Sequence, residues 1–115
     1  MNQEQIKLLT HMKKLIRNNK KRFAIRKDRD YLKELEIIGI TEHEAWFNHI
    51  LYLNNNMFFV DPKPKYKTNN NTLIFKKIIK NKLVYIKLSL EKEIEEEVVC
   101  LSFHIDNNGG NNYEM

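Results

Sequence analysis

Two segments near the end of the chain alternate apolar and polar residues, and this alternation constrains the fold more than any other feature. The segments are LVYIKLSL (residues 83–90) and VVCLSFHI (residues 98–105), and residues 91–97 between them are mostly acidic. Because successive side chains of a strand point to opposite faces, the pattern predicts an antiparallel hairpin with one apolar face. Eight apolar residues are expected on that core face: Val84, Ile86, Leu88, Leu90, Val99, Leu101, Phe103 and Ile105.

The opposite face of this hairpin is predicted to carry groups suited to acid–base chemistry. It would hold six residues: Tyr85, Lys87, Ser89, Cys100, Ser102 and His104. Histidine is the side chain whose ordinary pKa lies nearest to neutral pH. A half-buried sheet always has a polar face, however, so the hairpin alone is explained as simply by an ordinary solvent face.

A further strand precedes the hairpin. Residues 73–79 are expected to pair with residues 83–90 through a two-residue turn at 80–81 or 81–82. In this register Lys76 lies beside Tyr85, Lys87 and His104, whereas Lys77 faces the core, where a charge is costly. Three residues of the strand join the core face: Leu73, Phe75 and Ile79.

The first half of the chain is predicted to be mainly helical. Apolar residues at helical spacing (Ile6, Leu9, Met12, Leu15 and Ile16) indicate an amphipathic helix over residues 3–17. Residues 22–26 (RFAIR) alternate basic and apolar residues and predict a short edge strand in which Phe23 and Ile25 point the same way.

Two more helices are expected before the meander. The first begins at Lys27 or Asp28 and ends at Gly39, and its apolar stripe comprises Tyr31, Leu32, Leu35 and Ile38. The next begins at Thr41, which can form a capping box with Glu44, and it extends to about residue 53. Its inward residues are expected to be Ala45, Trp46, His49, Ile50 and Leu53. His43 and His49 are six positions apart, which does not suit one shared metal ion, so we assign no metal site.

Length and composition predict a single domain. The chain has 115 residues; residues 1–106 are expected to form the domain, and residues 107–115 are expected to be a disordered tail. One cysteine excludes an internal disulfide, and no apolar run is long enough to span a membrane, so we expect a cytoplasmic protein.

The charge is unevenly distributed along the chain. Residues 91–97 hold five acidic residues and one lysine, residues 13–29 hold nine cations and one acid, and residues 63–87 hold eight lysines and no acid. Basic blocks of this kind are typical of proteins that bind a phosphate backbone, although solvated surface lysine is the simpler alternative.

The order of these elements, together with several short strings, resembles the MqsR (motility quorum-sensing regulator) family of toxins, which are RelE-like mRNA interferases. The resemblance covers residues 10–106, through THMKKLIRNN, RFAIRKDRDYLKELEIIGIT, MFFVDPKP, KLVYIKLSL and VVCLSFH. It implies an α+β, RelE-like fold of three helices packed on a small twisted antiparallel sheet, with a C-terminal three-stranded meander. The family often has a glutamine on the first strand of the meander, whereas this chain has Ile74 near that position.

The resemblance also implies an activity: metal-independent, cofactor-independent cleavage of single-stranded mRNA, with the 2′-hydroxyl of the RNA as nucleophile. The catalytic set would be His104, Tyr85, Lys87 and Lys76, and the RNA-binding set would be Lys63, Lys65, Tyr66 and Lys67. A cognate antitoxin protein is the implied partner, and Arg22 and Arg26 are the residues expected to bind it. The alternative is a non-catalytic module of the same fold that binds a nucleic acid or a protein, such as a phage-encoded inhibitor.

Overall fold

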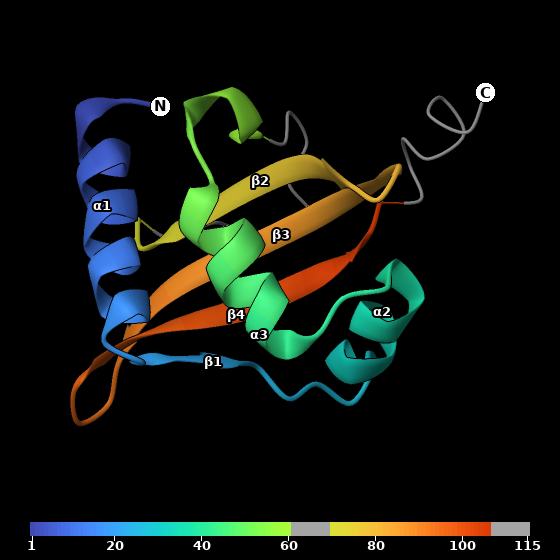
Figure 1. Cartoon of the computed structure of the whole chain (residues 1–115). Coiled ribbons are helices and arrows are strands. Elements are labelled where there is room, and N and C mark those ends of the chain that lie inside the picture. The colour runs from blue at the N-terminus through green and yellow to red at the C-terminus, as the bar shows by residue number, and fades with distance from the viewer. Residues whose placement is uncertain (61–69, 107–115) are drawn as a thin grey trace.

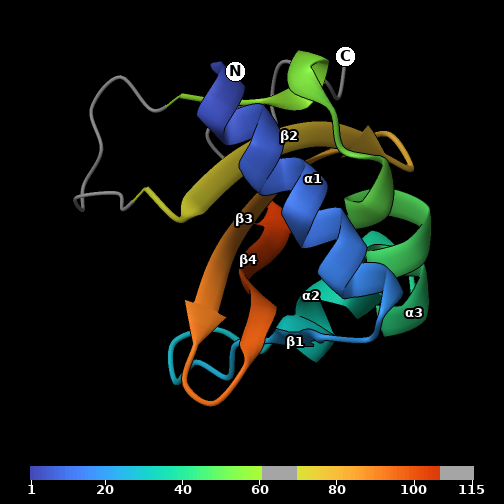
Figure 2. The same cartoon turned by 90° about the vertical axis from the view of Figure 1, so that its left-hand side faces the viewer.

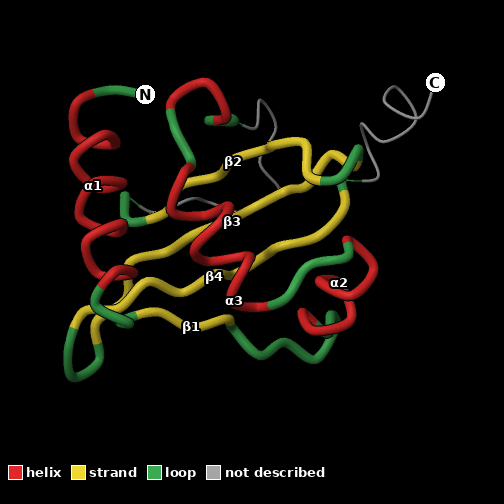
Figure 3. Tube along the Cα trace, in the orientation of Figure 1, coloured by secondary structure: helices red, strands yellow, loops and turns green. Residues whose placement is uncertain are grey.

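Helices and a four-stranded sheet make up this α+β protein (Figures 1 and 3). The computed structural model describes residues 1–60 and 70–106. The strands are β1 (Lys21–Phe23), β2 (Thr72–Ile79), β3 (Lys82–Lys92) and β4 (Glu96–Ile105), in the order β1-β4-β3-β2. No helix of the described residues is both long enough and apolar enough to cross a membrane.

The sheet is mixed, and this corrects the predicted antiparallel sheet. Strands β2, β3 and β4 form the expected antiparallel meander. Strand β1 instead pairs with β4 in parallel, with Arg22 opposite Val99. Between β1 and β4 the chain forms the helices that follow β1 and then β2 and β3. Parallel strands need a long connection of this kind.

The turn between β2 and β3 matches one of the two predicted alternatives. It consists of Lys80 and Asn81, which both have positive φ angles (50° and 65°), as a type I′ hairpin turn requires. Ile79 therefore lies opposite Lys82, and all three residues expected in the core from β2 are buried: Leu73, Phe75 and Ile79. Lys77 is half-buried opposite Val84, and burial lowers its pKa.

A β-bulge in β4 overturns part of the predicted core face. Lys87 pairs with Ser102 but Leu88 pairs with Cys100, so Leu101 is an extra residue on β4. The extra residue reverses the faces of the first half of the strand. Val98 and Cys100 therefore belong to the core, in place of the expected Val99 and Leu101. The placement of Cys100 on the polar face was thus wrong.

Helix α1 (Gln3–Arg17) has the predicted bounds. Asn2 caps it in a reciprocal capping box with Gln5, and its core-facing side buries Leu9, Met12, Leu15 and Ile16. Ile6 was expected in the same stripe but is 45% exposed. Figure 2 shows α1 lying across the sheet on the side from which α3 also covers it.

Strand β1 and helix α2 (Tyr31–Ile38) are both shorter than predicted. The strand ends at Phe23, so Ile25 is 92% exposed instead of facing the core. The N-cap of α2 is Asp30 rather than Lys27 or Asp28, and Leu32 is exposed. Gly39 ends α2 with a φ of 95°, the left-handed conformation expected there.

The third helical segment changes its winding along its length. Thr41 and Glu44 form the expected capping box at α3 (Glu42–Glu44), which continues as a π-helical turn, η1 (Ala45–His49), and a 3₁₀ turn, η2 (Ile50–Tyr52). Four of the five residues predicted to face inward are buried: Ala45, Trp46, Ile50 and Leu53. His49 is half-buried, and a last 3₁₀ turn, η3, spans Asn55–Met57.

The core lies between the sheet and the helices. Its largest fully buried side chains include Trp46, Phe75 and Phe103, one from the helical layer and two from the sheet. Phe23 of β1 contacts both Trp46 and Phe103, with ring centroids 5.1 and 6.2 Å away. Because one face of the sheet is buried in this core, the alternate residues of β2, β3 and β4, which include the predicted site residues, point to the other face.

Candidate functional site

Three of the predicted catalytic residues form one row across the outer face of the sheet. Lys76 of β2 lies opposite Tyr85 of β3, and Tyr85 lies opposite His104 of β4. The rings of Tyr85 and His104 stack, with centroids 5.3 Å apart and planes 21° apart. The structure therefore brings together a phenol, an imidazole and an ammonium group, as the strand registers predicted.

The hydrogen bonding of His104 determines which of its nitrogens can accept a proton. Nδ1 lies 2.9 Å from the carbonyl oxygen of Ile105. A carbonyl only accepts hydrogen bonds, so Nδ1 carries the proton in this contact and the neutral ring has its lone pair on Nε2. Partial burial lowers the pKa of His104; the bond to Ile105 opposes that shift, and the charge of Arg29 adds to it. The lowered pKa favours the neutral form of His104, in which Nε2 can act as a base.

Lys76 has an acidic partner that the sequence reasoning missed. Its Nζ lies 2.6 Å from Oδ2 of Asp106, a residue that is only 5% exposed. The same Nζ lies 3.8 Å from the ring centroid of Phe59. Asp106 follows the last strand two positions after His104, and its backbone N–H donates to the Leu83 carbonyl, so the hairpin pairing extends past Ile105. Because alternate residues of a strand point to the same face, the position of Asp106 two residues after His104 could have indicated that both lie on this face.

Lys87 occupies the next row of the same face. It lies between Ile74 of β2 and Ser102 of β4. Within residues 1–60 and 70–106 it forms no ion pair, in contrast to Lys76. Among the described residues of this face, Lys87 is therefore the cation whose charge is least compensated.

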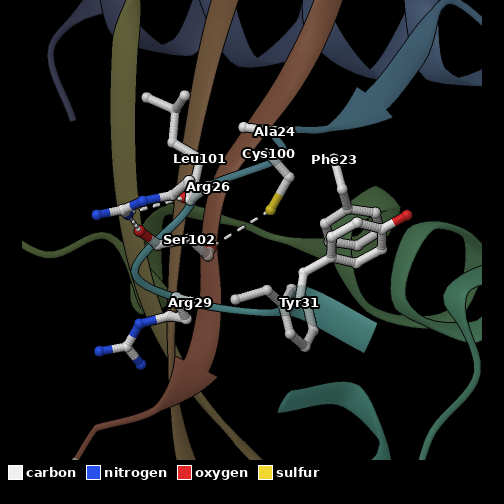
Figure 4. Close-up of a pocket in the computed structure, with 9 residues that line it drawn as sticks. Phe23, Ala24, Arg26, Arg29, Tyr31, Cys100, Leu101 and Ser102 are labelled. Atoms are coloured by element: carbon white, nitrogen blue, oxygen red, sulfur yellow. Dashed lines mark hydrogen bonds between the residues drawn. The ribbon is translucent and has the colours of Figure 1, made fainter. Parts of the chain in front are cut away.

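A small pocket lies between β1, β4 and the start of α2 (Figure 4). Its free volume of about 10 Å³ is enough for about one water molecule. Phe23 and Tyr31 stack on one side of β4, with ring centroids 4.6 Å apart, and Arg26 and Arg29 lie on the other side. The pocket is too small to hold a nucleotide, so it is not itself a substrate site.

The two arginines of this pocket add cations next to the predicted catalytic residues. Arg26 donates to both carboxylate oxygens of Asp28, at 3.1 and 2.8 Å, and to the Leu101 carbonyl and Ser102 hydroxyl, both at 3.3 Å. Arg29 lies 3.4 Å from Glu34. Arg26 was predicted to bind a protein partner and Arg29 had no predicted role, because nothing in the local sequence pattern shows that this loop returns to the end of β4.

Cys100 is a core residue rather than part of this face. Its Sγ lies 3.3 Å from the Ser102 carbonyl oxygen, and burial strongly raises the pKa of the thiol. A thiol held in its neutral form is a poor nucleophile. Cysteine chemistry therefore has no place at this site.

The remaining predicted site residues fall into two groups. Lys63, Lys65, Tyr66 and Lys67 lie outside the described residues. The expected antitoxin-binding residues Arg22 and Arg26 are both exposed, and each is already paired within the chain, Arg22 with Glu97 (2.7 Å) and Arg26 with Asp28.

The acidic segment of residues 91–97 is held to the body of the protein by side-chain contacts. Glu95 contacts Lys20 at 2.7 Å, Glu96 contacts His11 at 3.0 Å, and Glu97 contacts Arg22. These three carboxylates connect the β3–β4 hairpin to α1, to β1 and to the segment between them.

Among residues 1–60 and 70–106, no group of three or more histidine, cysteine, aspartate or glutamate side chains is arranged to hold a metal ion. His43 is exposed and packs on the Phe47 ring, with centroids 4.7 Å apart.

Comparisons with known proteins add no further assignment. No family profile, no curated protein and no solved structure matches the chain significantly.

Proposed function

We propose that this protein is an endoribonuclease that cleaves single-stranded RNA on the outer face of its sheet, as the toxin of a type II toxin–antitoxin pair. The observation that carries the proposal is the stacked pair of Tyr85 and His104, flanked by Lys76 and Lys87. The element order of a helix, a short strand, two helices and a three-stranded meander is the order that the resemblance to RelE-like mRNA interferases implies, and it supports the proposal.

The proposed reaction needs only groups of this face. Nε2 of neutral His104 takes the proton of the 2′-hydroxyl, and the 2′-oxygen attacks the adjacent phosphorus. The bond from phosphorus to the 5′-oxygen breaks, and we assign the Tyr85 hydroxyl as the donor that protonates the departing oxygen. The products are a 2′,3′-cyclic phosphate end and a 5′-hydroxyl end.

The developing charge on the phosphate needs a cation, and Lys87 suits this role better than Lys76. A phosphate competes with Asp106 for Lys76, whereas Lys87 has no ion-pair partner among the described residues. Preorganised charge of this kind stabilises a transition state most where water is excluded. We therefore assign Lys87 to the phosphate and Lys76 to holding Tyr85 and Asp106 in place.

The direct test is RNA cleavage by the purified chain and by two variants, His104→Ala and Tyr85→Phe. His104→Ala should reduce cleavage by about 10²- to 10⁴-fold, the usual effect of removing one general acid or base. An exposed histidine elsewhere on the chain provides the matched control, His43→Ala, which should cleave normally. Equal cleavage by His104→Ala would disprove the assignment.

A second candidate function is RNA binding without cleavage. The Lys76–Asp106 ion pair favours this function over cleavage, because Asp106 neutralises a cation that would otherwise stabilise the charge of a transition state beside His104. This alternative predicts salt-dependent RNA binding by a chain that yields no cyclic phosphate products. End-group analysis of the RNA separates the two functions.

A co-produced antitoxin and a cytoplasmic location complete the proposal. An acidic segment of the antitoxin would exchange with Glu97 at Arg22 and with Asp28 at Arg26. Reversing the charge of these two arginines should weaken the complex more than reversing Glu95 and Glu96 does. The opposite ranking, measured on the co-purified pair, would place the interface at the acidic segment of residues 91–97.

A further inference from the structure

The outer side of α1 carries cations that have no carboxylate partner among the described residues. Within residues 1–60 and 70–106, five lysines and arginines pair with carboxylates: Lys20, Arg22, Arg26, Arg29 and Lys76. Lys7, Lys14 and Arg17 of α1 have no such partner in this part of the chain. These three line one open groove on the helix, together with Ile6, Thr10 and His11.

The internal electrostatics of the helix do not account for this stripe. Lys14 and Arg17 lie in the last turn, where the helix dipole favours a positive charge, but Lys7 lies in the middle of the helix, where that effect has faded. Burial lowers the pKa of Lys13, and the charge of Arg17, one turn further along, adds to that shift, so these two cations of the helix repel one another. Such an arrangement gains stability when an external polyanion neutralises it.

We propose that the outer side of α1 is a second binding surface for the phosphate backbone of RNA, separate from the sheet face. From Lys7 to Arg17 the stripe extends about 15 Å along the helix. An RNA backbone presents phosphates repeatedly over such a length. The inference deepens the proposed function, because it takes RNA as the polyanion.

A lipid surface fits this helix less well. Peripheral membrane helices insert an apolar face between lipids, beside a basic face. The apolar face of α1 is already buried in the core through Leu9, Met12, Leu15 and Ile16. Ile6 is the only apolar residue among those that line the groove.

The distance between α1 and the sheet face means that RNAs of different length can distinguish the two binding surfaces. His11 of the groove contacts Glu96 at the start of β4, and His104 lies eight residues further along that strand. At about 3.4 Å per residue the strand covers about 27 Å between them, and α1 covers the side of the sheet opposite to the row of His104, so an RNA that reaches both surfaces must be longer than one that fills the sheet face alone. A tetranucleotide can occupy only one of them.

The test compares a charge-reversal pair on α1 with a matched pair elsewhere. Lys7→Glu/Lys14→Glu should lower the affinity for a single strand of about 20 nucleotides at least about tenfold near 0.1 M salt, and the salt dependence should fall by about 1.4 log units per tenfold change in salt, since each lost contact removes about 0.7. The control Lys33→Glu/Lys92→Glu changes the net charge equally at two exposed positions and should have little effect. Lys7→Gln/Lys14→Gln removes the charges without introducing acids next to the helix dipole.

The outcomes distinguish this inference from the proposed function. Binding and cleavage of a tetranucleotide should be unchanged in the α1 variants, because that RNA needs only the sheet face. If the α1 variants lose binding to the long RNA but no variant, nor the parent chain, cleaves RNA, the proposed reaction fails and the binding surface stands. Equal losses in the α1 pair and the control pair, or binding that does not depend on salt, would overturn the inference.

Discussion

Tyr85 and His104 face each other across β3 and β4, with their rings stacked at a centroid distance of 5.3 Å. Stacking on a phenol restricts the imidazole to one orientation, and the Nδ1 contact with Ile105 fixes its tautomer. Tyr85→Phe should keep the stack and remove only the hydroxyl. We expect this variant to fold normally and to lose RNA cleavage, whereas Tyr85→Ala should also alter the pH dependence of cleavage, measured between pH 5 and pH 8, because His104 loses its neighbour.

Stability should depend on pH through two half-buried histidines. Burial lowers the pKa of His104 and of His49 below the ordinary 6.5. Below about pH 6.5 the unfolded chain then binds more protons than the folded chain. The contribution of these histidines to the free energy of unfolding is therefore complete above about pH 6.5 and decreases as the pH falls below that value. Denaturant unfolding at several pH values should show a shallower dependence for His104→Gln than for the parent chain. The exposed His43→Gln is the control, and an unchanged slope in His104→Gln would contradict the expectation.

Removing Lys76 should affect stability more than removing Lys87 does. Lys76→Ala takes away the cation next to the buried carboxylate of Asp106, and we expect a loss of about 1–3 kcal/mol in the free energy of unfolding. Lys87→Ala breaks no ion pair within the described residues and should unfold at nearly the parental denaturant concentration. Lys76→Ala/Asp106→Asn should recover part of the loss. No recovery in the double variant would indicate that the ion pair is not the cause.

RNA affinity should respond to the same two lysines in the opposite order. Lys87→Ala should reduce the salt dependence of single-strand binding by about 0.7 log units per tenfold change in salt, as expected for one lost phosphate contact. Lys76→Ala should change it less, because Asp106 already compensates that charge. Fluorescence anisotropy over a salt series measures both slopes.

Cys100 should be unreactive in the native protein. Its side chain is buried, and its pKa is raised by that burial, so little thiolate forms at neutral pH. A thiol reagent should modify it only after unfolding, at a rate set by the opening of β4. Rapid modification of the folded chain would contradict the placement of Cys100 in the core.

The features that the sequence predicted correctly are those governed by local pattern. The helix over residues 3–17, the capping box of Thr41 and the left-handed Gly39 depend on neighbouring residues only. The register of β2 and β3 follows from a two-residue turn, which placed Lys76 beside Tyr85. These local rules are why the central row of the candidate site was predictable.

The features that were missed depend on contacts between distant segments. Leu101 continues an apolar alternation, so nothing in the sequence indicates that it is the extra residue of a bulge. The residues of β4 that pair with β1 in parallel are 77 positions further along the chain, and no local pattern identifies them. The Lys76–Asp106 ion pair joins the first strand of the meander to the residue after the last strand. Arg29 lies near His104 for the same reason, through folding of the chain rather than through spacing.

The pairing of β1 with β4 has a consequence for the order in which the protein can be made. Phe23 is synthesised 82 residues before Ile105, the last residue of β4, so at roughly 5–20 residues per second the first strand waits about 4–16 s for its only partner in the described sheet. The strand that carries His104 is also the strand that completes the sheet. A ribosome translating this message therefore cannot carry a finished site until β4 has been translated, which would protect the part of the message already read from the proposed activity of its own product.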